Sequence, residues 1–134
     1  MKEKLRALDL FCGAGGATKG LQCAGFNVVG VDLSPQPRYC GQKFIQMDAM
    51  KFEICSFIGG SRDYYPEICD RCGKDYKDIC HTQFIWASPP CQAHSRLNGI
   101  NAKKYKDFIS PIRDRLEQIG IPFVIENVVG APLL

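Results

Sequence analysis

Short apolar runs recur along the chain, separated by glycine, proline and charged stretches. Five of these runs are typical of strands: 5–11 (LRALDLF), 27–35 (NVVGVDLSP), 43–50 (KFIQMDAM), 83–88 (QFIWAS) and 121–129 (IPFVIENVV). Residues 17–26 and 110–120 have helical spacing, and Ser110 suits the N-cap of the second helix, with Pro111 at its first position and Gly120 at its C-cap. Near-continuous apolar strands alternating with helices predict a mostly parallel α/β sheet covered on both faces.

Length and composition narrow the class of protein. A chain of 134 residues suits one domain, 1–134, and it contains no apolar run near the ~20 residues of a membrane span. The apolar stretch before the first glycines is too short for a signal peptide, so we expect a cytoplasmic protein. A net charge of +3 is compatible with a polyanionic partner but does not require one. In a reducing compartment the eight cysteines are buried, metal-bound or catalytic rather than a disulfide framework.

A polar or otherwise special residue stands at or just after the end of every predicted strand. These residues are the glycines 13, 15 and 16, then Asp32, Asp48, Cys91 and Glu126. In parallel sheets of this kind, ligands bind outside the carboxyl ends of the strands. The sequence therefore predicts one site built from five strand ends.

The glycine-rich stretch DLFCGAGG indicates a nucleotide-like cofactor. The stretch fails the dinucleotide pattern G-x-G-x-x-G, because Thr18 stands where the third glycine belongs. A glycine turn still lets a ligand approach the backbone closely, Asp32 suits the two hydroxyls of a ribose, and Asp48 could accept a hydrogen bond from an exocyclic amine such as that of adenine. Together they favour a nucleoside cofactor without a pyrophosphate, such as S-adenosylmethionine. The alternative is a tight turn with two solvated loop acids.

The stretch ASPPCQ, residues 87–92, follows the fourth predicted strand. Pro89 and Pro90 fix their own φ and restrain the residues before them, which makes a stiff turn. Such a turn would aim the sulfur of Cys91 at one substrate atom, as a nucleophile requires. The alternative is a structural cysteine that packs as a small hydrophobe.

The stretches DLFCGAGG, SPPCQ and VIENVVGAPL occur in the order found in the DNA (cytosine-5) methyltransferases, and the chain resembles the small, phage-type members everywhere except at 51–82. The resemblance implies a Rossmann-like S-adenosylmethionine-dependent fold and transfer of a methyl group to cytosine carbon 5 in double-stranded DNA, on a base flipped from the duplex. Cys91 would attack carbon 6, and Glu126 would contact ring nitrogen 3 and the exocyclic amine. The cofactor would be surrounded by Phe11, Gly13, Gly15, Gly16, Asp32 and Asp48, with Pro89 near its methyl end.

The family continues beyond a fifth strand with a further strand, a target-recognition region and a closing helix, whereas this sequence ends at Leu134. We therefore expect a partial catalytic domain: a truncated enzyme, one half of a split enzyme or a gene fragment. Such a chain would need a C-terminal half or a partner chain and would be inactive alone. An inactive fragment is accordingly one rival interpretation. Another is a thymidylate-synthase-like protein, which also attacks carbon 6 of a pyrimidine with a cysteine, although the glycine turn counts against it.

Residues 51–82 form an insertion between the third and fourth predicted strands, and they are rich in cysteine. Cys69-x-x-Cys72 has the spacing of a structural zinc knuckle, and Cys80 and His81 follow it. Because Cys80 and His81 are adjacent, Cys55 is the alternative fourth ligand. The insertion thus predicts one structural zinc ion, the alternative being a loop with free thiols.

Overall fold

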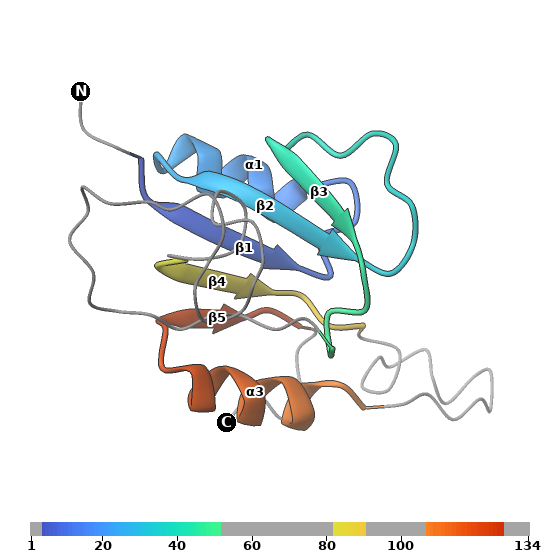
Figure 1. Cartoon of the computed structure of the whole chain (residues 1–134), viewed down its shortest axis with the longest axis vertical. Coiled ribbons are helices and arrows are strands. Elements are labelled where there is room, and N and C mark those ends of the chain that lie inside the picture. Colours follow the sequence, from blue (N-terminus) through green and yellow to red (C-terminus); the bar gives the residue numbers. More distant parts are fainter. Residues whose placement is uncertain (1–3, 52–81, 91–106, 128–134) are drawn as a thin grey trace, which may run out of the picture.

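The computed structural model describes residues 4–51, 82–90 and 107–127 of the chain. Five strands form one sheet in the order β3-β2-β1-β4-β5, and every neighbouring pair is parallel (Figure 1). The strands are β1 (Arg6–Leu10), β2 (Asn27–Asp32), β3 (Lys43–Gln46), β4 (Phe84–Ala87) and β5 (Phe123–Ile125). The helices are α1 (Gly16–Cys23) and α3 (Ile109–Ile119). All five predicted strands and both predicted helices are confirmed, as is the parallel α/β architecture.

The two helices cover opposite faces of the sheet, as the alternation of side chains along the strands requires. On one face Leu8 and Leu10 of β1 belong to the larger core cluster, together with Ile112 and Leu116 of α3. On the other face Ala7 packs with two further buried residues, Leu21 of α1 and Val28 of β2. Within the described residues the larger apolar core thus lies between the sheet and α3.

Helix α3 begins two residues earlier than predicted. Its N-cap is Phe108, and the side chain of Asp107 accepts a hydrogen bond from the backbone N–H of Ile109 at 2.9 Å. Ser110 is therefore inside the first turn instead of at the cap. Pro111 is tolerated there because backbone N–H groups in the first turn have no partner within the helix. The C-cap prediction is confirmed, since Gly120 adopts φ 76° and donates its N–H to Leu116.

The strand order places a topological switch at β1. The chain leaves β1 toward β2 on one side and returns to pair β4 on its other side. At such a switch the turns that leave neighbouring strands diverge and open a crevice at the carboxyl ends. The arrowheads in Figure 1 point toward this edge. No helix in the described parts of the chain is long and apolar enough to cross a membrane.

Candidate functional site

The turn between β1 and α1 is the most constrained piece of backbone in the described chain. Phe11, Gly13 and Gly15 all have positive φ, at 59°, 53° and 100°. Phe11 is the only described non-glycine residue in this region of φ, and such strain persists only where the surroundings enforce it. Apart from the adjacent residues and the backbone of α1, no atom of the described residues lies within 4 Å of where a Cβ would stand on Gly13 or Gly16. The turn therefore presents bare backbone to open space, as the sequence predicts for a ligand-binding turn.

Asp32, the last residue of β2, is bonded to that turn. Its Oδ2 accepts the backbone N–H of Gly13 at 2.9 Å, and its Oδ1 accepts the N–H of Ser34 at 3.0 Å. An ionised carboxylate has about four acceptor positions, so each oxygen of this half-buried side chain retains capacity for one more donor. The geometry is compatible with the predicted ribose contact, which stays a prediction.

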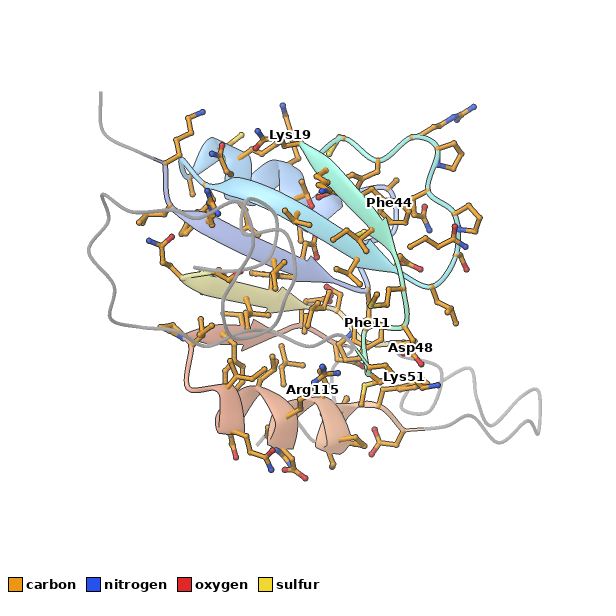
Figure 2. All side chains as sticks on the ribbon, viewed as in Figure 1. Phe11, Lys19, Phe44, Asp48, Lys51 and Arg115 are labelled. Carbon is orange, nitrogen blue, oxygen red and sulfur yellow. The ribbon has the colours of Figure 1, made fainter. Side chains whose placement is uncertain are left out.

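Asp48 lies beyond the end of β3, next to the end of β2, where Met47 donates its N–H to the carbonyl of Asp32 at 2.9 Å. The Oδ1 of Asp48 accepts the N–H of Met50 at 2.9 Å and so shapes a turn. Arg115 of α3 donates from Nη1 to the carbonyl of Ala49 in this turn at 3.1 Å. Figure 2 shows Phe11, Asp48 and Lys51 near the strand ends, with Arg115 on the neighbouring helix. The two predicted cofactor acids are therefore neighbours at one edge of the sheet.

The ends of β4 and β5 complete the edge. Ser88 donates its N–H to Leu10 at 3.1 Å, and its hydroxyl accepts the indole N–H of Trp86 at 2.9 Å. Pro89 is buried, and its carbonyl accepts a hydrogen bond from the side chain of Asn127 at 2.9 Å. Glu126 donates its backbone N–H to Ala87 at 2.9 Å, while the residue itself is exposed. The sequence analysis missed Asn127, although its place beside Glu126 at a strand end was the available signal.

A row of hydrogen-bonded polar side chains lies beneath the glycine turn, and the sequence analysis missed it as well. Thr18 of α1 donates its hydroxyl to Oδ2 of Asp9 at 2.6 Å, and both residues are 0% exposed. The hydroxyl of Tyr39 lies 2.9 Å from that of Thr18. The other Asp9 oxygen is buried and has no hydrogen-bond partner among the described residues. Desolvation by burial raises the pKa of this carboxyl, and the hydrogen bonds with Thr18 lower it by less. Thr18, which breaks the dinucleotide pattern, is thus the partner of a buried acid.

Cys12 lies in the same turn but is not a nucleophile. Burial, and to a lesser extent the nearby carboxylates of Asp9 and Asp32, raise the pKa of its thiol to about 12. The sulfur donates to the carbonyl of Gly13 at 3.4 Å. The thiol therefore stays protonated at neutral pH and packs as a small hydrophobe.

Several predicted residues lie outside the described residues, and their roles stay predictions. They are Cys91 and the zinc candidates Cys55, Cys69, Cys72, Cys80 and His81. Within residues 4–51, 82–90 and 107–127, no group of three or more His, Cys, Asp or Glu side chains could hold a metal ion.

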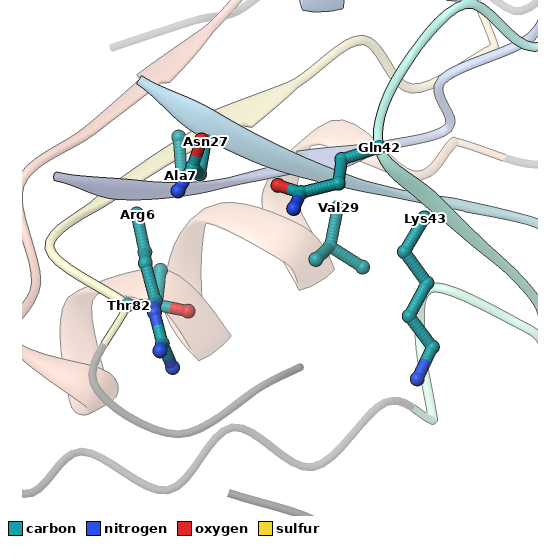
Figure 3. A pocket seen from close by; sticks show the side chains of 7 residues that line it. All are labelled: Arg6, Ala7, Asn27, Val29, Gln42, Lys43 and Thr82. Carbon is teal, nitrogen blue, oxygen red and sulfur yellow. The ribbon is translucent and has the colours of Figure 1, made fainter. Parts of the chain in front are cut away.

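A cavity of about 430 Å³ lies at the opposite edge of the sheet (Figure 3). Its lining comes largely from the starts of the strands: Arg6, Ala7, Asn27, Val29, Gln42, Lys43 and Thr82. The glycine turn, Asp32 and Asp48 are all at the carboxyl ends, so this cavity is not part of the candidate site.

Comparison with known proteins gives one family. A family model described as RNA cap guanine-N2 methyltransferase matches residues 4–105 of the chain. The matched range begins just before β1 and includes the glycine turn, Asp32, Asp48 and the turn after β4. No curated protein matches the chain.

This match corrects the function predicted from the sequence. The assignment to the DNA (cytosine-5) methyltransferases, with methyl transfer to cytosine carbon 5, is wrong, because the matching family methylates the N2 amine of guanine. The glycine turn and the strand-end acids were predicted from the sequence to bind the cofactor, and a cofactor prediction does not determine the methyl acceptor. In that resemblance the covalent cytosine chemistry rested mainly on Cys91. The covalent adduct belonged to that reaction and is not carried forward. The need for a further chain stays a prediction.

Proposed function

This chain belongs to the RNA cap guanine-N2 methyltransferase family, and on that premise we propose that it methylates the exocyclic N2 amine of a guanine in capped RNA. The chain is a methyltransferase with a Rossmann-like parallel sheet, and the family implies S-adenosyl-L-methionine as its cofactor. The observation that carries the proposal is the family match over residues 4–105.

The residues at the carboxyl edge suit this cofactor. Gly13 and Gly16 leave open space beside the backbone, which would admit the methionine part against the turn. Asp32 would accept hydrogen bonds from the ribose hydroxyls, and Asp48 one from the adenine amine. Phe11 would supply an apolar contact, and Pro89 would lie near the methyl end of the cofactor. When bound, the cofactor supplies an electrophilic methyl group on a positively charged sulfur.

The acceptor chemistry removes the need for a covalent protein intermediate. In guanine the N2 nitrogen is itself the nucleophile, but its lone pair is delocalised into the ring. A protein group that accepts hydrogen bonds from the amine favours attack by this nitrogen, and the proton that the amine loses must pass to such a group or to water. A thiol that adds to the ring would contribute nothing to this transfer. We therefore expect Cys91→Ser to retain methyl transfer.

Glu126 is the residue that we propose for recognition of the guanine. It is exposed at the end of β5, and its backbone bond to Ala87 holds it beside the end of β4. An ionised carboxylate only accepts hydrogen bonds, and guanine presents two adjacent donors, N1–H and N2–H. Adenine has an acceptor at N1, so it would be rejected. Asn127, bonded to the Pro89 carbonyl, would fix the distance between the two strand ends.

The test is to incubate the purified chain with tritiated S-adenosylmethionine and three substrates: capped RNA, the same RNA without a cap, and duplex DNA. Each product is digested to nucleosides and separated by chromatography. We expect label in N2-methylated guanosine from capped RNA only. Label in 5-methylcytosine from the DNA, or label in the capped RNA on an atom other than guanine N2, would overturn the assigned acceptor.

Glu126→Gln sharpens this test. The amide replaces one acceptor by a donor that faces the guanine, so the KM for capped RNA should rise about tenfold or more while the Kd for S-adenosylmethionine is unchanged. Glu117→Gln, on the exposed side of α3, is the matched control and should change neither constant. An equal effect on cofactor binding would place Glu126 in the cofactor pocket instead.

A further inference from the structure

Tyr39 lies in the segment between β2 and β3, and its ring packs against three glycines. A Cβ on Gly30 or on Gly41 would overlap the Tyr39 ring or hydroxyl, and one on Gly15 would come within 3.1 Å of the ring and 2.8 Å of the Cys40 sulfur. Gly30 is inside β2, where glycine normally weakens a strand and often marks a close approach. Glycines in two other backbone segments, Gly15 and Gly30, and Gly41 in its own segment thus leave room for one aromatic ring.

The Tyr39 hydroxyl reaches the row of hydrogen-bonded polar side chains beneath the glycine turn. Thr18 gives its only hydroxyl proton to Asp9, so Tyr39 must be the donor across the 2.9 Å to Thr18. Burial raises the pKa of Tyr39 well above its usual value, and the hydroxyl therefore stays a donor at every physiological pH. This single group connects the segment after β2 with both β1 and α1.

The residue after Tyr39 is bonded directly to the glycine turn. Cys40 donates its backbone N–H to Ala14 at 3.2 Å and its thiol to the carbonyl of Gly15 at 3.1 Å. At the other end of the same segment, Asp32 holds the N–H of Gly13. Both ends of segment 32–40 are therefore hydrogen-bonded to the glycine turn, and Tyr39 attaches that segment to the sheet and to α1.

We propose that Tyr39 is a positioning residue that holds the glycine turn in the shape required by the cofactor. The inference rests on the proposed function only for the location of S-adenosylmethionine at this turn. Without the Tyr39 anchor, segment 32–40 loses its fixed position, and the left-handed residues of the turn are then free to relax. Tyr39 itself contacts no reacting atom in this scheme.

The first test needs no ligand. Tyr39→Phe keeps the ring packed against the glycines and removes the hydroxyl donor. In the free protein, amide hydrogen exchange at Gly13 and Gly15 should become about tenfold faster, because their bonds to Asp32 and Cys12 open more often. Phe44→Leu is the matched control: this ring on β3 contacts Tyr39 with centroids 5.7 Å apart, and the variant should lower the Tm without changing exchange in the turn.

The second test measures the Kd of S-adenosylmethionine by calorimetry. Tyr39→Phe should raise the Kd about tenfold while kcat at saturating cofactor changes less than threefold, whereas Phe44→Leu should leave the Kd unchanged. If the parent protein does not bind the cofactor, the proposed function fails, and the exchange experiment alone decides the role of Tyr39. Unchanged exchange and unchanged Kd in Tyr39→Phe would overturn the inference.

A second pair of variants keeps the inference testable if Tyr39→Phe does not fold. Cys40→Ala removes the thiol bond to Gly15, and Cys40→Ser retains a donor there. We expect a threefold rise in Kd for the alanine variant and recovery in the serine variant. Equal affinity for the cofactor in both variants would contradict the proposal that segment 32–40 holds the glycine turn in place.

Discussion

The two faces of the sheet are built from different kinds of residue. Against α3 the described core cluster is entirely aliphatic, and it includes Leu8, Leu10, Ile85 and Leu116, each at most 1% exposed. Against α1 the apolar cluster is smaller, and beside it Asp9 pairs in register with Gly30, with Thr18 and Tyr39 lying over them.

Because of this difference, one face of the sheet mainly stabilises the fold and the other mainly fixes the positions of the turns. Burial of aliphatic side chains is non-directional, so the α3 face contributes free energy of folding without fixing the strand-end turns. Hydrogen bonds contribute less net free energy but are directional, and those beneath α1 fix the turns that carry the candidate site. We therefore expect substitutions on the two faces to affect different measurements.

The largest effect should follow from truncation on the α3 face. Leu116→Ala leaves a cavity in the larger cluster and should lower the free energy of unfolding by about 3 kcal/mol, or the Tm by roughly 10 °C. Cofactor Kd at a temperature where the variant is folded should be unchanged. The exposed neighbour Glu117→Ala should shift the Tm by no more than a degree or two. A weakened Kd in Leu116→Ala would show that the faces are not separable.

Adding a methyl group on the α1 face should lower the free energy of unfolding less than Leu116→Ala does, but it should weaken binding of the cofactor. In Gly30→Ala the new Cβ overlaps the Tyr39 ring and must displace it, which should cost about 2 kcal/mol and raise the cofactor Kd at least tenfold. Gly20→Ala is the control with the opposite sign. Apart from its chain neighbours and the backbone of α1, no atom of the described residues lies within 4 Å of the Cβ position of Gly20. Alanine should therefore stabilise the helix by about 0.5–1 kcal/mol. Denaturant titration of the two variants distinguishes these outcomes.

The smallest effect is a pH dependence carried by Asp9. Burial raises the pKa of this carboxyl in the folded protein above its ordinary 3.8, so the native state keeps a proton that the unfolded chain has already lost. Stability must then fall as pH rises from about 4 to the folded pKa. Asn at position 9 does not titrate. The Tm of the parent minus that of Asp9→Asn should therefore decrease over this range and level off above it.

A difference between parent and Asp9→Asn that stays constant with pH would mean that the buried carboxyl does not carry a raised pKa.

What the sequence could predict follows from how local each signal is. The strands, the Gly120 cap and the placement of Asp32 and Asp48 at one edge all depend on short patterns, and the structure confirms them. Asp9 was read as part of an apolar strand, because one polar residue does not change a hydrophobic run. Its partners come from α1 and from the segment after β2, and only the folded chain brings these together. The methyl acceptor predicted from the sequence is wrong, because the strand-end pattern was related to the cofactor and carries no information on the acceptor.

The position of β1 between β2 and β4 also sets an order of events during synthesis. Ala7 pairs with Val28 on one side and with Phe84 on the other. One edge of β1 therefore stays unpaired until β4, which is distant in the sequence, has been synthesised. At roughly 5–20 residues per second, β4 leaves the ribosome several seconds after β1. During that interval the apolar edge of β1 is an unpaired template that another nascent chain could join. Slow translation between these strands should therefore reduce the yield of folded protein more than slow translation after β5.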